Sequence, residues 1–225
     1  IEYGDFQTPK ELADEVCQKL VELGVSPEYV IEPTCGLGVF LESATEKFSN
    51  VKKFVGVEVN SEYYSELKTA SKNFSEPEKI DIREGDFFKF DWQRLLKETG
   101  GEILILGNFP WVTNATQGAI GGLNLPQKTN FQNLNGLDAL TGKSNFDISE
   151  FMLIKVSEWF LHRTGHLAIL VKTSVARKFL NHLHKTNQGV AHSAIYNIDA
   201  MKHFRAAVDA CLLYCRFDPD MHNYD

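Results

Sequence analysis

An asparagine, an aromatic residue, a proline and a tryptophan follow the apolar run "EILILG" in the sequence. The side-chain carbonyl of Asn108 can accept a hydrogen bond without ionising, and the main chain of Phe109 offers a second carbonyl. Two such acceptors, held in place by the backbone, could bind a hydrogen-bond donor without changing their protonation state. Pro110 restricts Phe109 to extended geometry, and the flat face of Trp111 suits stacking against a planar group. This stretch therefore predicts a polar group at the end of a buried strand, next to a flat aromatic face.

Three earlier apolar runs also end in residues that could bind a ligand. Gly36 and Gly38 lie in "IEPTCGLGVFLESA", where glycine lets the backbone approach a ligand closely. Glu58 ends the next run, about 20 residues on, where a carboxylate accepts ribose hydroxyls in nucleotide-binding sheets. Asp86 ends the third run, and Phe87 follows it as a cover for an adenine ring. One strand-end acid is commonplace, but the ordered set predicts a nucleotide site. The sequence has no GxxxxGK[ST] motif for a triphosphate.

Short runs rich in valine, isoleucine and leucine alternate with segments of helical periodicity. The predicted strands lie at 30–32, 54–59, 79–84, 103–107, 166–172, 193–198 and 208–217. The predicted helices lie at 9–23, 40–49, 61–73, 91–98, 148–162 and 174–186. Non-alternating apolar strands are typical of parallel sheets buried on both faces. The sequence therefore predicts an α/β fold with a doubly wound, mostly parallel sheet and helices on both faces.

Two helix starts carry local signals, and one segment fits neither element type. Thr8 precedes Pro9 in "TPKE" and predicts an N-cap of the first helix; Asp147 in "DISE" predicts another. Residues 113–145 are rich in Gly, Asn, Gln and Thr, which predicts a long polar loop with a functional role. The chain as a whole, residues 1–225, is expected to form a single catalytic domain.

Composition narrows the class of protein. The chain has 225 residues, of which 43% are hydrophobic, and a net charge of −7, which argues against a free-standing nucleic-acid binder. Basic residues gather between 161 and 205, so a polyanion would approach the second half; the alternative is a solvated basic helix. No apolar run approaches the roughly 20 residues of a membrane span, so no membrane partner is expected. The cysteines predict reduced, buried thiols in a cytoplasmic protein and no metal site (Cys17, Cys35, Cys211, Cys215).

Five short motifs occur in a fixed order: "FQTPKELAD", "EPTCGLGVFL", "GVEV", "GDFF" and "NFPW". Together they resemble the S-adenosylmethionine-dependent amino-methyltransferases, in particular the gamma group of adenine-specific DNA methyltransferases from restriction–modification systems. The resemblance runs from about residue 4 to residue 217. It implies a Rossmann-like class I methyltransferase fold with seven strands, the last antiparallel. It also implies methyl transfer to the 6-amino group of adenine in duplex DNA, in a bacterial or archaeal cell.

The resemblance assigns roles to particular residues. The implied S-adenosylmethionine-binding residues are Thr8, Glu32, Pro33, Cys35, Gly36, Gly38, Glu58, Val59, Asp86, Phe87 and Asn108, and Phe146 or Phe151 would line the cofactor's adenine. The implied catalytic motif is Asn108, Phe109, Pro110 and Trp111. Trp111 and Phe204 would hold the extruded base between two rings. Phe109 stands where the family usually has proline. The resemblance implies a role only for the main-chain carbonyl at this position, and phenylalanine provides that acceptor as proline does.

Members of the gamma group usually carry a target-recognition domain after the last strand. We therefore expect such a domain in a separate or downstream part of the protein, with a restriction subunit as a further partner. Two other readings stay open. The substrate could be a ribosomal-RNA adenine or a protein glutamine, or the chain could be a non-catalytic, cofactor-binding subunit of a restriction or modification complex.

Overall fold

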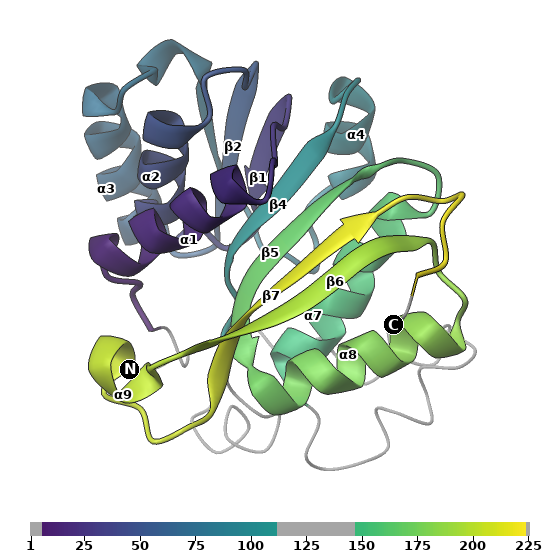
Figure 1. Cartoon of the computed structure of the whole chain (residues 1–225). Helices are drawn as coiled ribbons and strands as arrows, with labels where there is room; N and C mark the ends of the chain where they lie inside the picture. The colour runs from purple at the N-terminus through teal and green to yellow at the C-terminus, as the bar shows by residue number, and fades with distance from the viewer. Residues whose placement is uncertain (1–5, 112–146, 224–225) are drawn as a thin grey trace.

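The computed structural model describes residues 6–111 and 147–223 (Figure 1). The predicted loop at 113–145 and Phe146 lie outside these residues. The described part contains one sheet with strand order β3-β2-β1-β4-β5-β7-β6. The strands are β1 (Tyr29–Glu32), β2 (Lys53–Glu58), β3 (Ile80–Glu84), β4 (Ile103–Asn108), β5 (Gly165–Lys172), β6 (Val190–Ile198) and β7 (Ala210–Phe217). Each predicted strand is present, with its ends shifted by three residues at most.

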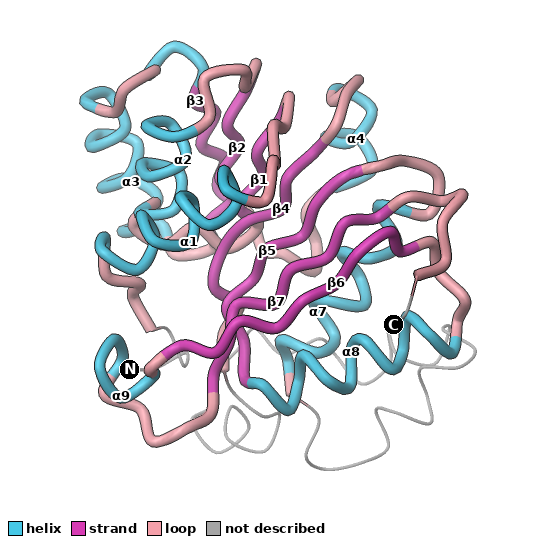
Figure 2. The backbone as a smooth tube through the Cα atoms, viewed as in Figure 1, coloured by secondary structure: helices cyan, strands magenta, loops and turns pink. Residues whose placement is uncertain are grey.

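Helices cover both faces of the sheet (Figure 2). The helices are α1 (Lys10–Glu22), α2 (Val39–Lys47), α3 (Ser61–Ala70), α4 (Trp92–Glu98), α7 (Ile148–Ser157), α8 (Thr173–Lys185) and α9 (Ala200–Phe204), with 3₁₀ turns η1 (Ser71–Asn73), η2 (Pro77–Lys79) and η4 (Glu158–Phe160). One core packs against α1, α2 and α3, and the other packs against α4, α7 and α8. Side chains alternate along a strand, so successive residues lie in opposite cores, as Val30 and Ile31 of β1 do.

The pairing confirms the predicted fold class. β7 runs antiparallel to β5 and β6, whereas β1 to β5 pair in parallel. This is the doubly wound, mostly parallel seven-stranded sheet with an antiparallel last strand that the sequence predicts. The carboxyl ends of β1 to β5 consequently meet at one edge, where ligands bind in sheets of this kind.

The helix-cap predictions have different outcomes. Asp147 caps α7, since its Oδ1 accepts the N–H of Ser149 at 3.1 Å. The Thr8 prediction is wrong: Pro9 occupies the N-cap of α1, which has no side-chain cap bond. The Thr8 hydroxyl instead lies 3.4 Å from Asn108 Nδ2. The short helix α9 was not predicted from the sequence.

The described residues form neither a membrane span nor a cluster of metal-ligating side chains. Between residues 6–111 and 147–223, no helix is both long and apolar enough to cross a membrane. The same residues bring together no group of three or more His, Cys, Asp or Glu side chains that could hold a metal ion. The four cysteines are buried free thiols, as the sequence predicts.

Candidate active site

A pocket opens at the carboxyl ends of β1 to β4. It collects the predicted residues Pro33, Gly36, Glu58, Val59, Asp86, Phe87, Asn108, Phe109 and Pro110. It also has lining residues that were not predicted: Phe6, Thr34, Asn60, Tyr63, Gly85, Phe88, Ile148 and Met152. The glycine turn, the strand-end acids and the asparagine motif thus share one cavity, although they are spread over more than 70 residues of sequence.

Glu58 organises the polar side of this pocket. Its carboxylate is buried, and its Oε2 accepts the main-chain N–H of Gly36 at 2.7 Å. Its Oε1 accepts the N–H of Asn60 at 2.8 Å, and Asn60 in turn caps α3. Glu58 thereby ties the glycine turn after β1 to the start of α3. A carboxylate offers about four acceptor sites, so these two bonds are compatible with ligand hydroxyls at the same group.

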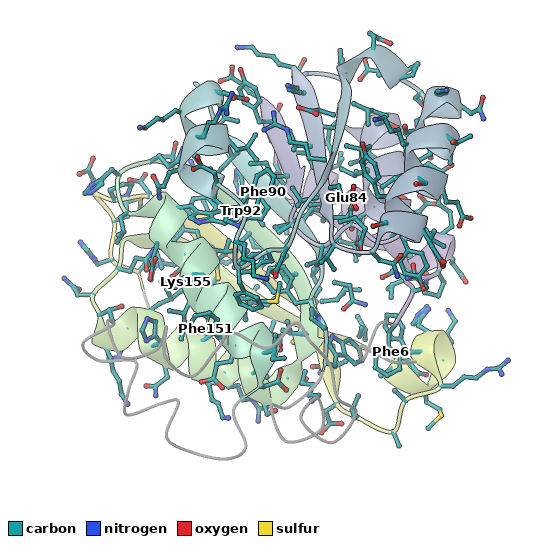
Figure 3. The ribbon with its side chains drawn as sticks, turned by 180° about the vertical axis from the view of Figure 1, so that it is seen from behind. Phe6, Glu84, Phe90, Trp92, Phe151 and Lys155 are labelled. Atoms are coloured by element: carbon teal, nitrogen blue, oxygen red, sulfur yellow. The ribbon has the colours of Figure 1, made fainter. Side chains whose placement is uncertain are left out.

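Asp86 and two phenylalanines form the next part of the wall. Asp86 Oδ1 accepts the N–H of Phe88 at 2.9 Å, and its Oδ2 lies 3.4 Å from Lys89 Nζ. Phe87 is buried and packs against Trp92. The Phe88 ring meets the Phe87 ring edge to face, with centroids 5.1 Å apart. Phe151 belongs to the core behind the pocket, and its ring centroid lies 5.6 Å from that of Phe88. Phe90, Trp92 and Phe151 lie on the α4 and α7 side of the sheet (Figure 3).

Asn108 ends β4 with its amide held in one orientation. Its Nδ2 donates to the main-chain carbonyl of Phe6 at 3.1 Å and lies 3.4 Å from the hydroxyl of Thr8. A carbonyl can only accept, so the amide nitrogen must face Phe6. Asn108 Oδ1 is buried and has no hydrogen-bond partner among residues 6–111 and 147–223. An unsatisfied buried acceptor is costly, and such a group in a pocket is a candidate for a ligand contact.

Phe109 has a second role that the sequence did not reveal. Its side chain is 1% exposed and lies in the core with Phe87, with ring centroids 6.1 Å apart. Its N–H donates to the carbonyl of Leu170 on β5 at 3.4 Å. The expectation that only its main-chain carbonyl is needed is therefore too narrow, because the ring also fills the core beneath the pocket.

The structure brings Trp111 and Phe204 into contact, and their stacking on a target base stays a prediction. Their ring centroids are 5.0 Å apart with an interplanar angle of 70°, so the rings touch edge to face. The indole Nε1 of Trp111 donates to the carbonyl of Leu170 at 3.4 Å. The rings are brought together as predicted, but the space between them is closed.

Three predicted cofactor residues lie behind the pocket rather than on its surface. Cys35 is buried in the core on the α1 and α2 face, and its burial raises the pKa of the thiol well above its usual range. Glu32 is 3% exposed; burial raises the pKa of its carboxyl group, and the charge of Glu58 adds to this effect. A Cβ on Gly38 would lie 2.2 Å from Leu67 Cδ1. Gly38 therefore serves close packing at the start of α2.

The lining residues that sequence reasoning missed had weak signals. Phe88 is the second aromatic of "GDFF", and Asn60 follows the acid of "GVEV" by two residues. Met152 belongs to a helix whose residues are nearly all buried, so no face of it pointed to a ligand. Phe6 reaches the site by a contact across 102 residues of sequence, which local patterns do not encode.

The fold and this pocket together place the chain in a structural class, that of the Rossmann-like class I methyltransferase fold. It superposes on the methyltransferase subunit of the type I restriction–modification system from Streptococcus thermophilus with a TM-score of 0.58 and 16% identity, covering 96% of this chain and 46% of that one. It also superposes on TYW2 from M. jannaschii, solved in complex with AdoMet, with a TM-score of 0.52, 13% identity and coverage of 92% and 74%. Similarity at this level concerns the fold alone.

Two curated relatives resemble the chain at the level of sequence, and both are named type II methyltransferases. Over 224 residues, the chain is 55% identical to the type II methyltransferase M.NspV from Nostoc sp.. The chain spans 46% of that relative's length. No protein-family model matches the chain.

Proposed function

We propose that this chain is the catalytic part of an S-adenosylmethionine-dependent DNA methyltransferase of the gamma group, which methylates the 6-amino group of adenine in a restriction–modification system. The observation that carries the proposal is the amide of Asn108. Its nitrogen is fixed by Phe6 and Thr8, which leaves a buried oxygen in the pocket with no partner among the described residues. The name of the type II methyltransferase relative supports methyl transfer in a restriction–modification system.

The pocket residues fit the cofactor. Glu58, held by two main-chain N–H groups, suits the ribose hydroxyls, and Val59 and Phe88 suit the faces of an adenine ring. Asp86 lies at the next strand end as an acceptor for the adenine amino group. S-adenosylmethionine bound by these residues would supply an electrophilic methyl group.

The chain's own residues would then prepare the amine. An adenine amino group is a poor nucleophile because its lone pair is delocalised into the ring. Asn108 Oδ1 would accept one of its hydrogens and the carbonyl of Phe109 the other, which localises the lone pair on nitrogen. Neither acceptor has to change its protonation state. The catalytic effect comes from preorganised acceptors that need no reorientation during the reaction.

Target recognition is proposed to lie outside residues 1–225. The matched part of the type II methyltransferase relative is about half of that protein, and this chain carries a net charge of −7. Duplex DNA binding depends on neutralising phosphates, so we expect weak, unspecific DNA binding by these residues alone. A recognition domain or a partner subunit, in a bacterial or archaeal cytoplasm, would supply the specificity.

The test is a methylation assay with tritiated S-adenosylmethionine on DNA, RNA and protein, performed with the full-length protein. We expect label in DNA adenine. Asn108→Ala should lower the single-turnover rate on the order of a hundredfold or more, with cofactor affinity nearly intact. Asn197→Ala, an exposed amide on β6, is the matched control and should keep the rate. Full activity of Asn108→Ala would exclude this mechanism, and label only in RNA or protein would reassign the substrate.

A further inference from the structure

Three aromatic rings pack together near Asn108, whose side-chain nitrogen binds the carbonyl of Phe6. Their centroids are 5.2 Å apart for Phe6 and Trp111, 5.8 Å for Phe6 and Phe204, and 5.0 Å for Trp111 and Phe204. The interplanar angles are 47°, 64° and 70°. Parallel, separated rings could hold a flat group between them, but these rings touch at steep angles. As they stand, no planar base fits between any two of them.

The three rings differ in how firmly they are held. Trp111 is buried, and its indole donates to the carbonyl of Leu170 on the central strand β5. Phe204 is buried at the end of α9, which Asp199 caps. Phe6 is half-buried and lies beside α9 (Figure 3). Its carbonyl is fixed by Asn108, but that bond leaves the side-chain torsions of Phe6 unconstrained. Of the three, the Phe6 ring can leave with the least disruption.

We propose that Phe6 is the plug of the base site. Its ring occupies the place of the target base in the empty protein, and the incoming base displaces it from Trp111 and Phe204. The proposal rests on the proposed function, because it takes these two residues as the walls of the base site. A purine, with its larger face, replaces the lost ring contacts more fully than a pyrimidine does. Phe6 would therefore favour adenine over the smaller bases.

The same segment also reaches the cofactor side of the pocket. Phe6 is one of the lining residues, and a Cβ on Gly36 would lie 3.2 Å from Gln7 Oε1. The state of the plug can therefore depend on what fills the cofactor pocket. A test of the plug has to keep that pocket filled in every variant.

The experiment measures adenosine binding to protein saturated with S-adenosylhomocysteine, by equilibrium dialysis with labelled adenosine. The saturating ligand blocks the cofactor pocket, so bound adenosine reports on the base site. Phe6→Ala should bind adenosine more tightly, by a factor of about 5 to about 150, since two aromatic contacts no longer compete. Phe204→Ala should bind adenosine more weakly, because a wall is lost. Phe6→Leu, which keeps most of the plug volume, should stay close to the wild type.

Cytidine provides a second readout. The Phe6→Ala change should raise cytidine affinity more than adenosine affinity, so that the preference for the purine shrinks. Thermal melting checks that each variant is folded; if Phe6→Ala is unfolded, Phe6→Val is used and should shift affinity in the same direction.

The outcomes separate the plug from the proposed function. Weaker adenosine binding by Phe6→Ala, as for Phe204→Ala, would make Phe6 a wall and overturn the plug. Equal binding by wild type and Phe6→Ala would also overturn it, while the methylation assay on Asn108 could still succeed. If no variant binds adenosine with the cofactor pocket filled, the base site itself is wrong, and the plug falls with it.

Discussion

Replacing Glu58 by glutamine tests the polar side of the pocket with the smallest change in shape. Both carboxylate oxygens accept main-chain N–H groups, from Gly36 at 2.7 Å and from Asn60 at 2.8 Å. Glutamine has one oxygen and one NH₂ group, so one N–H loses its acceptor and faces a donor instead. A hydrogen bond to a charged group contributes about 1.5–3 kcal/mol. Glu58 holds the glycine turn that we assign to the cofactor, so this loss should weaken cofactor binding. With about 1.4 kcal/mol per factor of ten, the expected loss of cofactor affinity is roughly 10- to 150-fold.

The assay is calorimetric titration with S-adenosylhomocysteine, accompanied by thermal melts. Glu84→Gln is the matched control: Glu84 ends the neighbouring strand β3, is exposed, and accepts only a bond from the Ser61 hydroxyl among the hydrogen bonds seen for it. We expect affinity close to the wild type for Glu84→Gln and the stated loss for Glu58→Gln. Unchanged affinity of Glu58→Gln with a lowered melting temperature would show that Glu58 only holds the fold, and the assignment of Glu58 to the cofactor would be refuted.

Three further predictions concern stability. Gly38→Ala should destabilise the fold more than Gly24→Ala. Both glycines have positive φ, but a Cβ would meet Leu67 at Gly38, whereas nothing lies within 4 Å of a Cβ at Gly24. Equal urea midpoints for the two variants would contradict this packing argument. Phe109→Ala should cost about 3–5 kcal/mol in unfolding free energy, as for other buried phenylalanines, and a loss below 1 kcal/mol in urea titrations would show that its ring is dispensable. Burial lowers the pKa of His166 below its usual 6.5. The unfolded chain therefore binds more protons at this residue, and the stability of the fold should decrease as the pH drops through about 6.5. If His166→Gln shows the same dependence of melting temperature on pH as the wild type, His166 is not the cause.

The strand ends were predictable because parallel strands share one edge. Gly36, Glu58, Asp86 and Asn108 each follow an apolar run, and alternation with helices fixes the strands as parallel. Their carboxyl ends must then converge, whatever the details of packing. This is why the residues of the pocket could be named from short motifs before any contact was known.

Contacts between residues that are distant in the sequence could not be predicted from the motifs. The first-turn pattern around Thr8 predicted a cap, but the hydroxyl lies by Asn108, 100 residues away. Cys35 sits inside a ligand motif, and the twist of the turn directs its thiol into the core. Trp111 and Phe204 contact each other and also Phe6, which lies far from both of them in the sequence. No local sequence pattern carries such information.

The central position of β7 has a consequence for synthesis. β7 pairs along Ala210–Phe217 with β5 on one side and β6 on the other. While a ribosome is still making these residues, β5 keeps an apolar edge with unpaired N–H and C=O groups, a template for association with other chains. A chain that stops short of β7 would consequently leave this edge of β5 open to pairing with other chains.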